Sequence, residues 1–483
     1  MKKILLLILT LVLVASMMTS CLPLSILFLL LDQESEIITN EGAGLPEGEE
    51  GIFKIDFTKA DKVKNVTDQG YYLGGCPTTG KVPVLVIPVE FSDSPAASKG
   101  YTIQTIQNAF YGNRTNYYSV EEYYYLSSYG NLDLDFNVLD HWFKPEFSSK
   151  HYEKLTDIDE YGEEYYVGDQ VIMDEALSYL EDVMDLSAYD SDKNGIIDAV
   201  VMVNTLTVNP EKDFHWAYRG WNTYTDEDGN KQEYDGVSAN DYLWMAYGFM
   251  HESSDSEGNP IYTNKSILNT FTYIHEFGHI LGADDYYDTE YLSDSTPLEG
   301  YDIMDETLGD HNPYTKFNYG WITTSRLITT DTSVTLTLES FEKSGDTIII
   351  ANNWDESLGV YQEYYVIIYY TKTLLNRTAN GYFLNNGIVV YHVNASLYSY
   401  ELDGKTVYDV YNNNTSYLGI LGTGTKDNLI ELVKSGGAVL FTKGNSLKTQ
   451  TDDLGNELCY TFTVDLLTNN SATLTFTKKG LSH

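Results

Sequence analysis

Residues 275–285 read HEFGHILGADD. On an α-helix, His275 and His279 lie on one face a single turn apart, so both imidazoles can bind the same metal ion. Glu276 lies off that line and can reach a water molecule at the metal. Apolar residues recur every three or four positions around the motif, which predicts a helix with one buried face. These apolar residues are Ile267, Phe271, Ile274 and Leu281.

The residues after the second histidine extend this pattern. Gly282 is the residue type that ends a helix and turns the chain. Asp285 follows His279 by six residues, where a reversed chain can return a third ligand to the metal. The alternative is a pair of structural histidines on an ordinary helix, and a glycine and an acid at these spacings argue against it. We therefore expect a zinc site formed by His275, His279 and Asp285, with Glu276 beside it.

A second polar cluster, DSDKNGIID, spans residues 190–198. Oxygen-bearing side chains at alternate positions, with glycine at the sixth, resemble the beginning of a calcium-binding loop. The twelfth position is Val201 instead of the bidentate acid of an EF-hand, so this segment is not an EF-hand. Two interpretations stay open: a partial calcium loop with Asp190, Asp192 and Asp198 as ligands, or a turn that leads into the next strand.

The type of predicted secondary structure changes along the chain. Over 79–322, predicted strands alternate with predicted helices, which favours an α/β-type mixed sheet that carries the histidine helix. Over 323–483, short β-type runs are separated by Gly, Asn and Asp, which predicts a β-sandwich domain. The expected fold class is thus α+β. The strands predicted before residue 322 are 81–91, 132–138 and 196–203, with helices at 119–126 and 174–184. The later runs are 333–338, 347–350, 364–368, 387–393, 438–441, 460–464 and 472–476.

The first 31 residues have the features of an export signal. Two lysines precede an apolar run, and no charge occurs from residue 4 to residue 31. The sequence MTSC at 18–21 resembles a bacterial lipobox, in which Cys21 becomes lipidated. The uncharged run is also long enough for an uncleaved membrane anchor. Both interpretations place the protein on the extracellular side of a bacterial cytoplasmic membrane, and we favour the lipoprotein. Residues 32–78 are then an acidic spacer or a short pro-segment.

The composition restricts the classes of partner. The 483 residues contain 29 Lys and Arg against 71 Asp and Glu, a formal net charge of −42. This excess of acid argues against nucleic acid as a partner and against electrostatic docking on anionic lipid, so the N-terminal anchor is the only membrane contact expected. We expect a monomer. Apart from Cys21, only Cys76 and Cys459 are present, and they either pair or are two buried thiols.

The motif and its surroundings resemble a known enzyme family. HExxHxxGxxD is followed, nineteen residues after Asp285, by Met304 in the sequence GYDIMD. This combination resembles the metzincin-type zinc peptidases with their Met-turn, in particular the immune inhibitor A-like secreted metallopeptidases of bacteria. Further similar segments extend the resemblance over about residues 80–395. They are VPVLVIPVEF at 82–91, SVEEY at 119–123, SYGNL at 128–132, the loop at 190–198, PYTKFNYGW at 313–321 and GIVVYHV at 387–393.

The resemblance implies a zinc-dependent endopeptidase that hydrolyses protein or peptide substrates. It implies His275, His279 and Asp285 as the zinc ligands. It also implies Glu276 as the catalytic base and Met304 as the apolar residue beneath the site.

Two further points stay open at the level of sequence. Tyr301, His311 and Tyr314 all follow the motif as candidates to stabilise an oxyanion. The first competing function is a catalytically inactive surface adhesion or binding protein on a peptidase scaffold. The second is a zinc hydrolase that acts on something other than protein.

Overall fold

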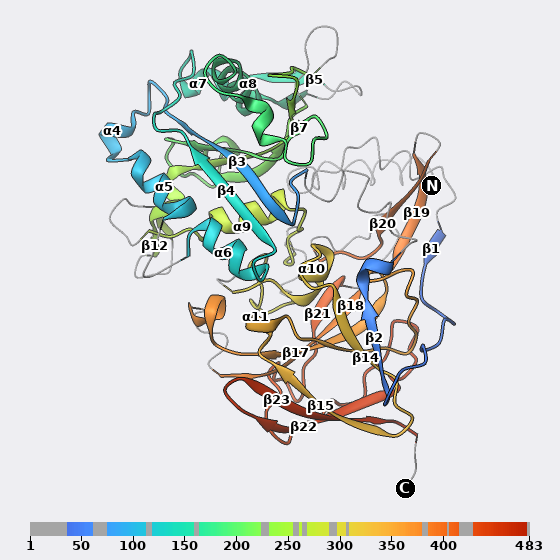
Figure 1. The fold of residues 1–483 in the computed structure, drawn as a ribbon. Helices are drawn as coiled ribbons and strands as arrows, with labels where there is room; N and C mark the ends of the chain where they lie inside the picture. Colours follow the sequence, from blue (N-terminus) through green and yellow to red (C-terminus); the bar gives the residue numbers. More distant parts are fainter. Residues whose placement is uncertain are drawn as a thin grey trace, which may run out of the picture. The chain divides into compact units, whose positions relative to one another are not determined.

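The computed structural model describes residues 36–60, 75–112, 118–158, 164–223, 231–254, 260–262, 268–288, 297–305, 309–378, 385–402, 405–414 and 428–480. Helices and several sheets occur together, so the fold class is α+β. The chain divides into two compact units (Figure 1). One unit is residues 70–283, and the other combines residues 1–69 with 284–483.

A mixed five-stranded sheet, in the order β4-β3-β8-β11-β9, is the centre of the 70–283 unit. Strands β3 (Gly80–Val89), β4 (Leu132–Val138), β8 (Val200–Asn204) and β11 (Asp241–Ala246) run parallel to their neighbours. Strand β9 (Ala217–Trp221) pairs antiparallel with β11 at the edge. The predicted strands at 81–91 and 132–138 are confirmed, and β4 alternates buried and exposed residues as expected.

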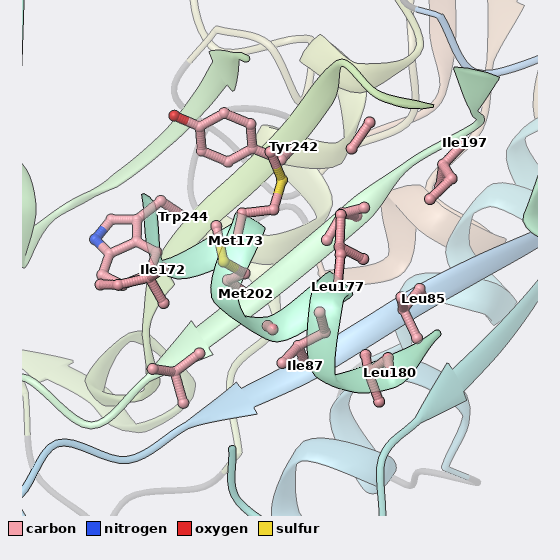
Figure 2. Close-up of a cluster of buried hydrophobic side chains, with 14 of the residues drawn as sticks. Leu85, Ile87, Ile172, Met173, Leu177, Leu180, Ile197, Met202, Tyr242 and Trp244 are labelled. Carbon is pink, nitrogen blue, oxygen red and sulfur yellow. The ribbon is translucent and has the colours of Figure 1, made fainter. Parts of the chain in front are cut away.

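The helix α8 (Gly168–Leu180) covers one face of this sheet (Figure 2). Its apolar side chains pack against side chains of β3, β8 and β11 in one buried cluster. The helix residues labelled there are Ile172, Met173, Leu177 and Leu180, and the labelled residues of β3, β8 and β11 are Leu85, Ile87, Met202, Tyr242 and Trp244. A helix was predicted over 174–184, but it begins at Gly168, because Ile172 and Met173 extend the buried face by one turn.

Aromatic side chains join the sheet to two helices, α5 (Ile103–Tyr111) and α9 (Phe271–Ile280). The helix α6 (Val120–Ser127) contacts α9 through the rings of Tyr124 and Phe277. The ring of Phe136 in β4 lies with its centroid 4.9 Å from that of Phe110 in α5 and 5.5 Å from that of Phe277 in α9. These contacts hold α9, the helix with the two histidines, against the sheet.

The predicted strand 196–203 is divided in two. Strand β7 (Ile196–Ile197) pairs with β10 (Ser238–Ala239), and β8 begins only at Val200. Asp198 lies at the break, where its backbone N–H donates to the carbonyl of Tyr189, 2.8 Å away.

In the second unit, a six-stranded and a three-stranded sheet share one core. The larger sheet has the order β2 (Ile52–Asp56), β14 (Thr324–Ile328), β16 (Ile348–Ile350), β17 (Glu363–Tyr370), β18 (Gly387–Asn394), β21 (Ile430–Leu432). The smaller has the order β15 (Ser333–Glu339), β23 (Ser471–Lys478), β22 (Tyr460–Leu467). Buried side chains of both sheets, such as Ile367 and Leu474, belong to this core. The predicted run 438–441 forms only isolated bridges, at Ala438 and Phe441.

The segment expected to be a spacer contains two strands. Strand β1 (Glu36–Ile38) pairs with β19 (Leu397–Leu402), which pairs with β20 (Lys405–Val410). Strand β2 pairs antiparallel with β14 and buries Ile55. The apolar run of β2 is short and lies in an acidic region, so the sequence did not predict this strand.

The division of the chain also differs from the boundary expected after residue 322. Residues 284–322 belong to the unit that contains residues 323–483, and hydrogen bonds join the two segments. The hydroxyl of Tyr361 donates to Asn318 Oδ1 over 2.6 Å, and the backbone N–H of Leu432 donates to the carbonyl of Pro297 over 3.0 Å.

The remaining short elements connect these parts. The helices are α4 (Ala96–Lys99), α7 (Ser149–Tyr152), α10 (Pro313–Asn318) and α11 (Phe341–Ser344). The strands are β5 (Thr156–Ile158), β6 (Glu164–Tyr166), β12 (Glu252–Ser254) and β13 (Pro260–Tyr262). The 3₁₀ turns are η1 (Phe57–Lys59), η2 (Leu186–Tyr189), η3 (Asp213–His215), η4 (Tyr247–His251) and η5 (Leu374–Thr378).

The predicted anchor and its Cys21 lie outside the described residues. Within the described part of the chain, no helix combines the length and hydrophobicity needed to span a bilayer. Cys76 is a buried free thiol and Cys459 is a half-buried free thiol.

Candidate metal centre

Buried hydrogen bonds fix helix α9 in the 70–283 unit. The hydroxyl of Tyr124 in α6 donates to the carbonyl of Ile274 over 2.6 Å. The hydroxyl of Tyr273 donates to the carbonyl of Ala246, at the end of β11, over 3.0 Å. At the start of the helix, Asn269 Oδ1 accepts a hydrogen bond of 2.9 Å from the N–H of Phe271. This bond satisfies one of the backbone donors that have no partner within the helix. The helix is therefore held at its start and in its middle.

The two histidines lie together on this helix, as their spacing predicts. The ring centroids of His275 and His279 are 5.0 Å apart, with an interplanar angle of 87°. His275 and Glu276 are each only 8% exposed, while His279 is half-buried. The imidazole of His275 and the carboxylate of Glu276 are thus largely withdrawn from bulk water.

The helix ends in the turn that the sequence indicated. Gly282 has a φ of +98°, in the left-handed region that favours glycine. Its N–H donates to the carbonyl of His279 over 3.0 Å, and the N–H of Ala283 donates to that of Gly278 over 3.0 Å. This pair of bonds defines a Schellman motif, which reverses the chain at the end of a helix.

The reversed chain also orients the second histidine. His279 Nδ1 lies 2.7 Å from the carbonyl oxygen of Ala283. Because a carbonyl only accepts, Nδ1 carries the proton, and the lone pair of the neutral ring is then on Nε2. A backbone partner of this kind is what fixes the tautomer of a metal-binding histidine.

The same turn brings the third predicted ligand to the histidines. One ligand atom each from His275, His279 and Asp285 lie within 4.8 Å of one another. The ligand atoms of a tetrahedral zinc site are about 3.3 Å apart, so small side-chain movements would close this group around an ion. Two imidazoles and one carboxylate are an established zinc donor set, and they leave a fourth position open. The donor set therefore fits zinc.

Hydrogen bonds also determine the backbone conformation around Met304. The carbonyl of Met304 accepts a bond of 2.9 Å from the N–H of Tyr286, the residue after Asp285. The N–H of Met304 donates to Asp302 Oδ1 over 2.7 Å, and Met304 is fully buried. Burial raises the pKa of Asp302 to about 7. The predicted Met-turn residue is thus tied to the chain next to the third predicted ligand.

The three oxyanion candidates are all buried residues of the second unit. The ring of Tyr301 contacts that of Tyr370 at a centroid distance of 5.9 Å, and the ring of His311 contacts that of Trp321 at 5.7 Å. Burial raises the pKa of Tyr314 well above its ordinary value, so this hydroxyl keeps its proton and can donate.

The 190–198 loop brings its three predicted ligands together as well. One carboxylate oxygen each from Asp190, Asp192 and Asp198 lie within 4.8 Å of one another. The N–H groups of Asn194 and Gly195 donate to the carboxylate of Asp190 over 3.0 and 2.9 Å, so the loop is also the turn of the second interpretation. The two interpretations are therefore compatible.

The electrostatics of this loop favour a cation. Asp198 is 1% exposed; its Oδ2 accepts a bond from Ser191, but its buried Oδ1 has no hydrogen-bond partner among the described residues. Burial, with repulsion from Asp192 and Asp190, raises the pKa of Asp198 to about 6. A divalent cation would relieve this repulsion, and calcium prefers such oxygen ligands.

Two further polar residues of the 70–283 unit, His215 and Arg219, have structural partners. His215 bonds to Glu153 through Nε2 over 2.5 Å and to the carbonyl of Thr207 through Nδ1 over 3.0 Å. Arg219 bonds to Asp241 on the neighbouring strand, over 2.8 Å from Nε.

One cluster was missed by sequence reasoning. Ligand atoms of Glu363, His392 and Asp453 lie within 4.8 Å of one another in the second unit. His392 belongs to the predicted β-type run 387–393, and it lies in β18. The three residues have no short spacing, so only the pairing of β17 with β18 could have associated Glu363 with His392.

No model of a known protein family matches the chain, and no curated protein is similar to it.

Proposed function

We propose that the protein is a zinc-dependent endopeptidase with a metzincin-like catalytic domain and a C-terminal β-sandwich domain. The observation that supports this most strongly is the approach of His275, His279 and Asp285 to within 4.8 Å of one another, beside Glu276. Nothing in the ordinary packing of a helix requires two histidines and an acid to converge in this way. A bound metal gives a reason for all three.

The chemistry divides between the metal and the chain. When bound, zinc supplies Lewis acidity, which polarises a peptide carbonyl and acidifies water. The carboxylate of Glu276 accepts the proton of the attacking water and then donates it to the departing amine. Because Glu276 is 8% exposed, few solvent molecules compete with the substrate for its carboxylate. The bond from His279 to Ala283 keeps that ring in the orientation that metal binding needs.

A peptide is the substrate class that suits the neighbouring sheet. Strand β9 is at the edge of the five-stranded order, with β11 as its pairing partner, and its residues are mostly half-buried. Helix α9 packs against β9 and β11. An extended peptide can add to such an edge through main-chain hydrogen bonds, which depend little on side-chain sequence. This argument favours an endopeptidase over a hydrolase of other substrates.

The remaining parts of the proposal concern location and a second ion. Export and attachment through Cys21 would place the enzyme outside a bacterial cell, and the net charge of −42 suits a solvated extracellular surface. Calcium at residues 190–198 would stabilise the loop that leads into β7. The alternative is an inactive adhesion protein on the same scaffold; a scaffold without activity has no need to keep Glu276.

The test is the substitution Glu276→Gln in the full chain, with cleavage of fluorescent casein and zinc content as the two readouts. Loss of a general base lowers turnover by about a hundredfold to ten-thousandfold, while the zinc content should not change. The control is Glu181→Gln, which replaces an exposed acid at the end of α8 and should leave both readouts unaltered. Undiminished turnover in the Glu276 variant, or no chelator-sensitive cleavage by the native chain, would show the proposal to be wrong.

A further inference from the structure

A second group of metal-ligating side chains lies in the 284–483 part of the chain. Strands β17 and β18 pair antiparallel with Tyr365 opposite His392. Because side chains alternate along a strand, Glu363 is on the same face as Tyr365 and is a diagonal neighbour of His392. His392 Nε2 lies 2.9 Å from Glu363 Oε1. Asp453 comes from the turn before β22 and completes the group of three ligand atoms within 4.8 Å.

These side chains are held by other groups. The N–H of Asp453 donates to Glu363 Oε1 over 3.0 Å, and Asn394 Nδ2 donates to Asp453 Oδ2. The His392 ring stacks on the Tyr365 ring with a centroid distance of 4.5 Å and an interplanar angle of 14°. His392 is only 9% exposed. The histidine and both carboxylates are therefore positioned before any ligand arrives.

The other nitrogen of His392 faces a further carboxylate. Glu431 Oε1 lies 3.5 Å from Nδ1. A metal ion on Nε2 would leave Nδ1 to donate to Glu431, the carboxylate–histidine–metal arrangement that orients a ligand and increases its basicity. One ring nitrogen, Nε2, therefore has ligand partners, while the other, Nδ1, has a supporting carboxylate.

A cavity of about 490 Å³ adjoins this cluster. His392, Tyr365 and Glu431 are among the residues in its wall, together with Gln450. The cavity gives solvent access to an otherwise buried histidine. Asp453 is exposed, so the cluster is also accessible from the side of this carboxylate.

From these observations we propose that Glu363, His392 and Asp453 form a second metal site, for a divalent first-row transition metal ion such as zinc. One imidazole with two carboxylates suits such ions, whereas calcium takes oxygen ligands. In a tetrahedral zinc site the nitrogen and oxygen ligands are about 3.3 Å apart. The 2.9 Å separation of His392 and Glu363 would thus widen by roughly 0.4 Å on binding, which a side-chain rotation allows.

The competing explanation is that His392 is only a protonated histidine held between Glu363 and Glu431. Both explanations use the same contacts, but only the metal site makes Asp453 a ligand of a bound ion. Asp453 is exposed, so Asp453→Asn removes a ligand with little effect on packing. The experiment is built on this substitution.

The experiment measures zinc bound by the full chain in the background of His275→Ala with His279→Ala, which removes the first site. After chelation, the protein is equilibrated with zinc in excess calcium, freed of unbound ions, and analysed for zinc by elemental analysis. We expect one zinc ion per chain in this background. Adding Asp453→Asn should weaken zinc binding at least tenfold, and Glu431→Gln should weaken it by about tenfold to a hundredfold.

The matched control is Asp465→Asn, which replaces an exposed acid of β22 outside the cluster and should leave zinc binding unchanged. No bound zinc in the double-histidine background would overturn the second site. So would equal zinc contents with and without Asp453→Asn, or an equal loss in the Asp465 control. Because the first site is absent throughout, these outcomes are independent of whether the protein is a peptidase.

Discussion

Replacing Gly282 by alanine is expected to weaken zinc binding through a residue that touches no metal. Gly282 has a φ of +98° at the end of α9, and the Schellman bonds on either side of it require that conformation. A Cβ in the left-handed region costs about 1–2 kcal/mol. The unfolded chain also loses freedom on Gly→Ala replacement, which offsets about 0.4–1 kcal/mol of that cost. The net loss of stability should be about 1 kcal/mol.

The Gly282→Ala substitution should also lower the zinc affinity of the site. If the turn shifts, the carbonyl of Ala283 no longer fixes the His279 ring, and Asp285 is displaced with it. Loss of such an orienting bond lowers metal affinity by about tenfold to a hundredfold. Zinc affinity is measured by competition with a chromophoric chelator, and stability by urea unfolding of the metal-free chain.

The structure offers a matched control at Gly320. It follows α10 in a second Schellman motif, with a φ of +71°, and a Cβ added there would meet no atom within 4 Å. Gly320→Ala should therefore destabilise the chain by a similar amount and leave zinc affinity unchanged. Equal zinc affinities in the native chain and in the Gly282 variant would refute the role of this turn in the metal site.

Three other substitutions test separate features. In the Asp453→Asn background, which lacks the second proposed site, Asp285→Ala should abolish stoichiometric zinc measured by elemental analysis, whereas Asp284→Ala, at the exposed neighbour, should not. Full zinc in the Asp285 variant would exclude Asp285 as a ligand. Saturating calcium at a hundredfold excess over its Kd should stabilise the native chain by about 2.7 kcal/mol, and Asp198→Asn should remove this shift in thermal unfolding; equal shifts would exclude the loop as a calcium site. Burial raises the pKa of Glu342 from 4.5 to about 7, so its contribution to stability is full below about pH 4.5 and is lost as the pH rises through 7. The native chain should therefore lose up to about 3 kcal/mol more unfolding free energy between pH 4.5 and 8 than the Glu342→Gln variant does. Parallel pH profiles of unfolding free energy in the two proteins would contradict this.

Local patterns predicted local structure well. The alternation of β4, the apolar run of β3 and the i, i+4 spacing of the histidines each depend on residues that are close in sequence. The helix end at Gly282 was also predictable, because glycine is the residue that takes a left-handed conformation at little cost.

Features that depend on distant partners could not be predicted in the same way. Strand β2 is a short run in an acidic region, and it is a strand because β14, far along the chain, pairs with it. The association of Glu363, His392 and Asp453 likewise depends on strand register and on a turn. No residue pattern in one segment contains this information.

The pairing of β2 with β14 affects how the chain would respond to proteolytic processing. The ladder extends from Asp56–Thr324 to Ile52–Ile328, and β1 adds a second attachment through β19. Both precede the 70–283 unit in the chain, yet they belong to the sheets of the other unit. A cut between β2 and β3 would therefore sever the chain without releasing its N-terminal piece, since backbone hydrogen bonds would still join that piece to the rest. An anchor at the N-terminus would keep its hold on the cleaved protein.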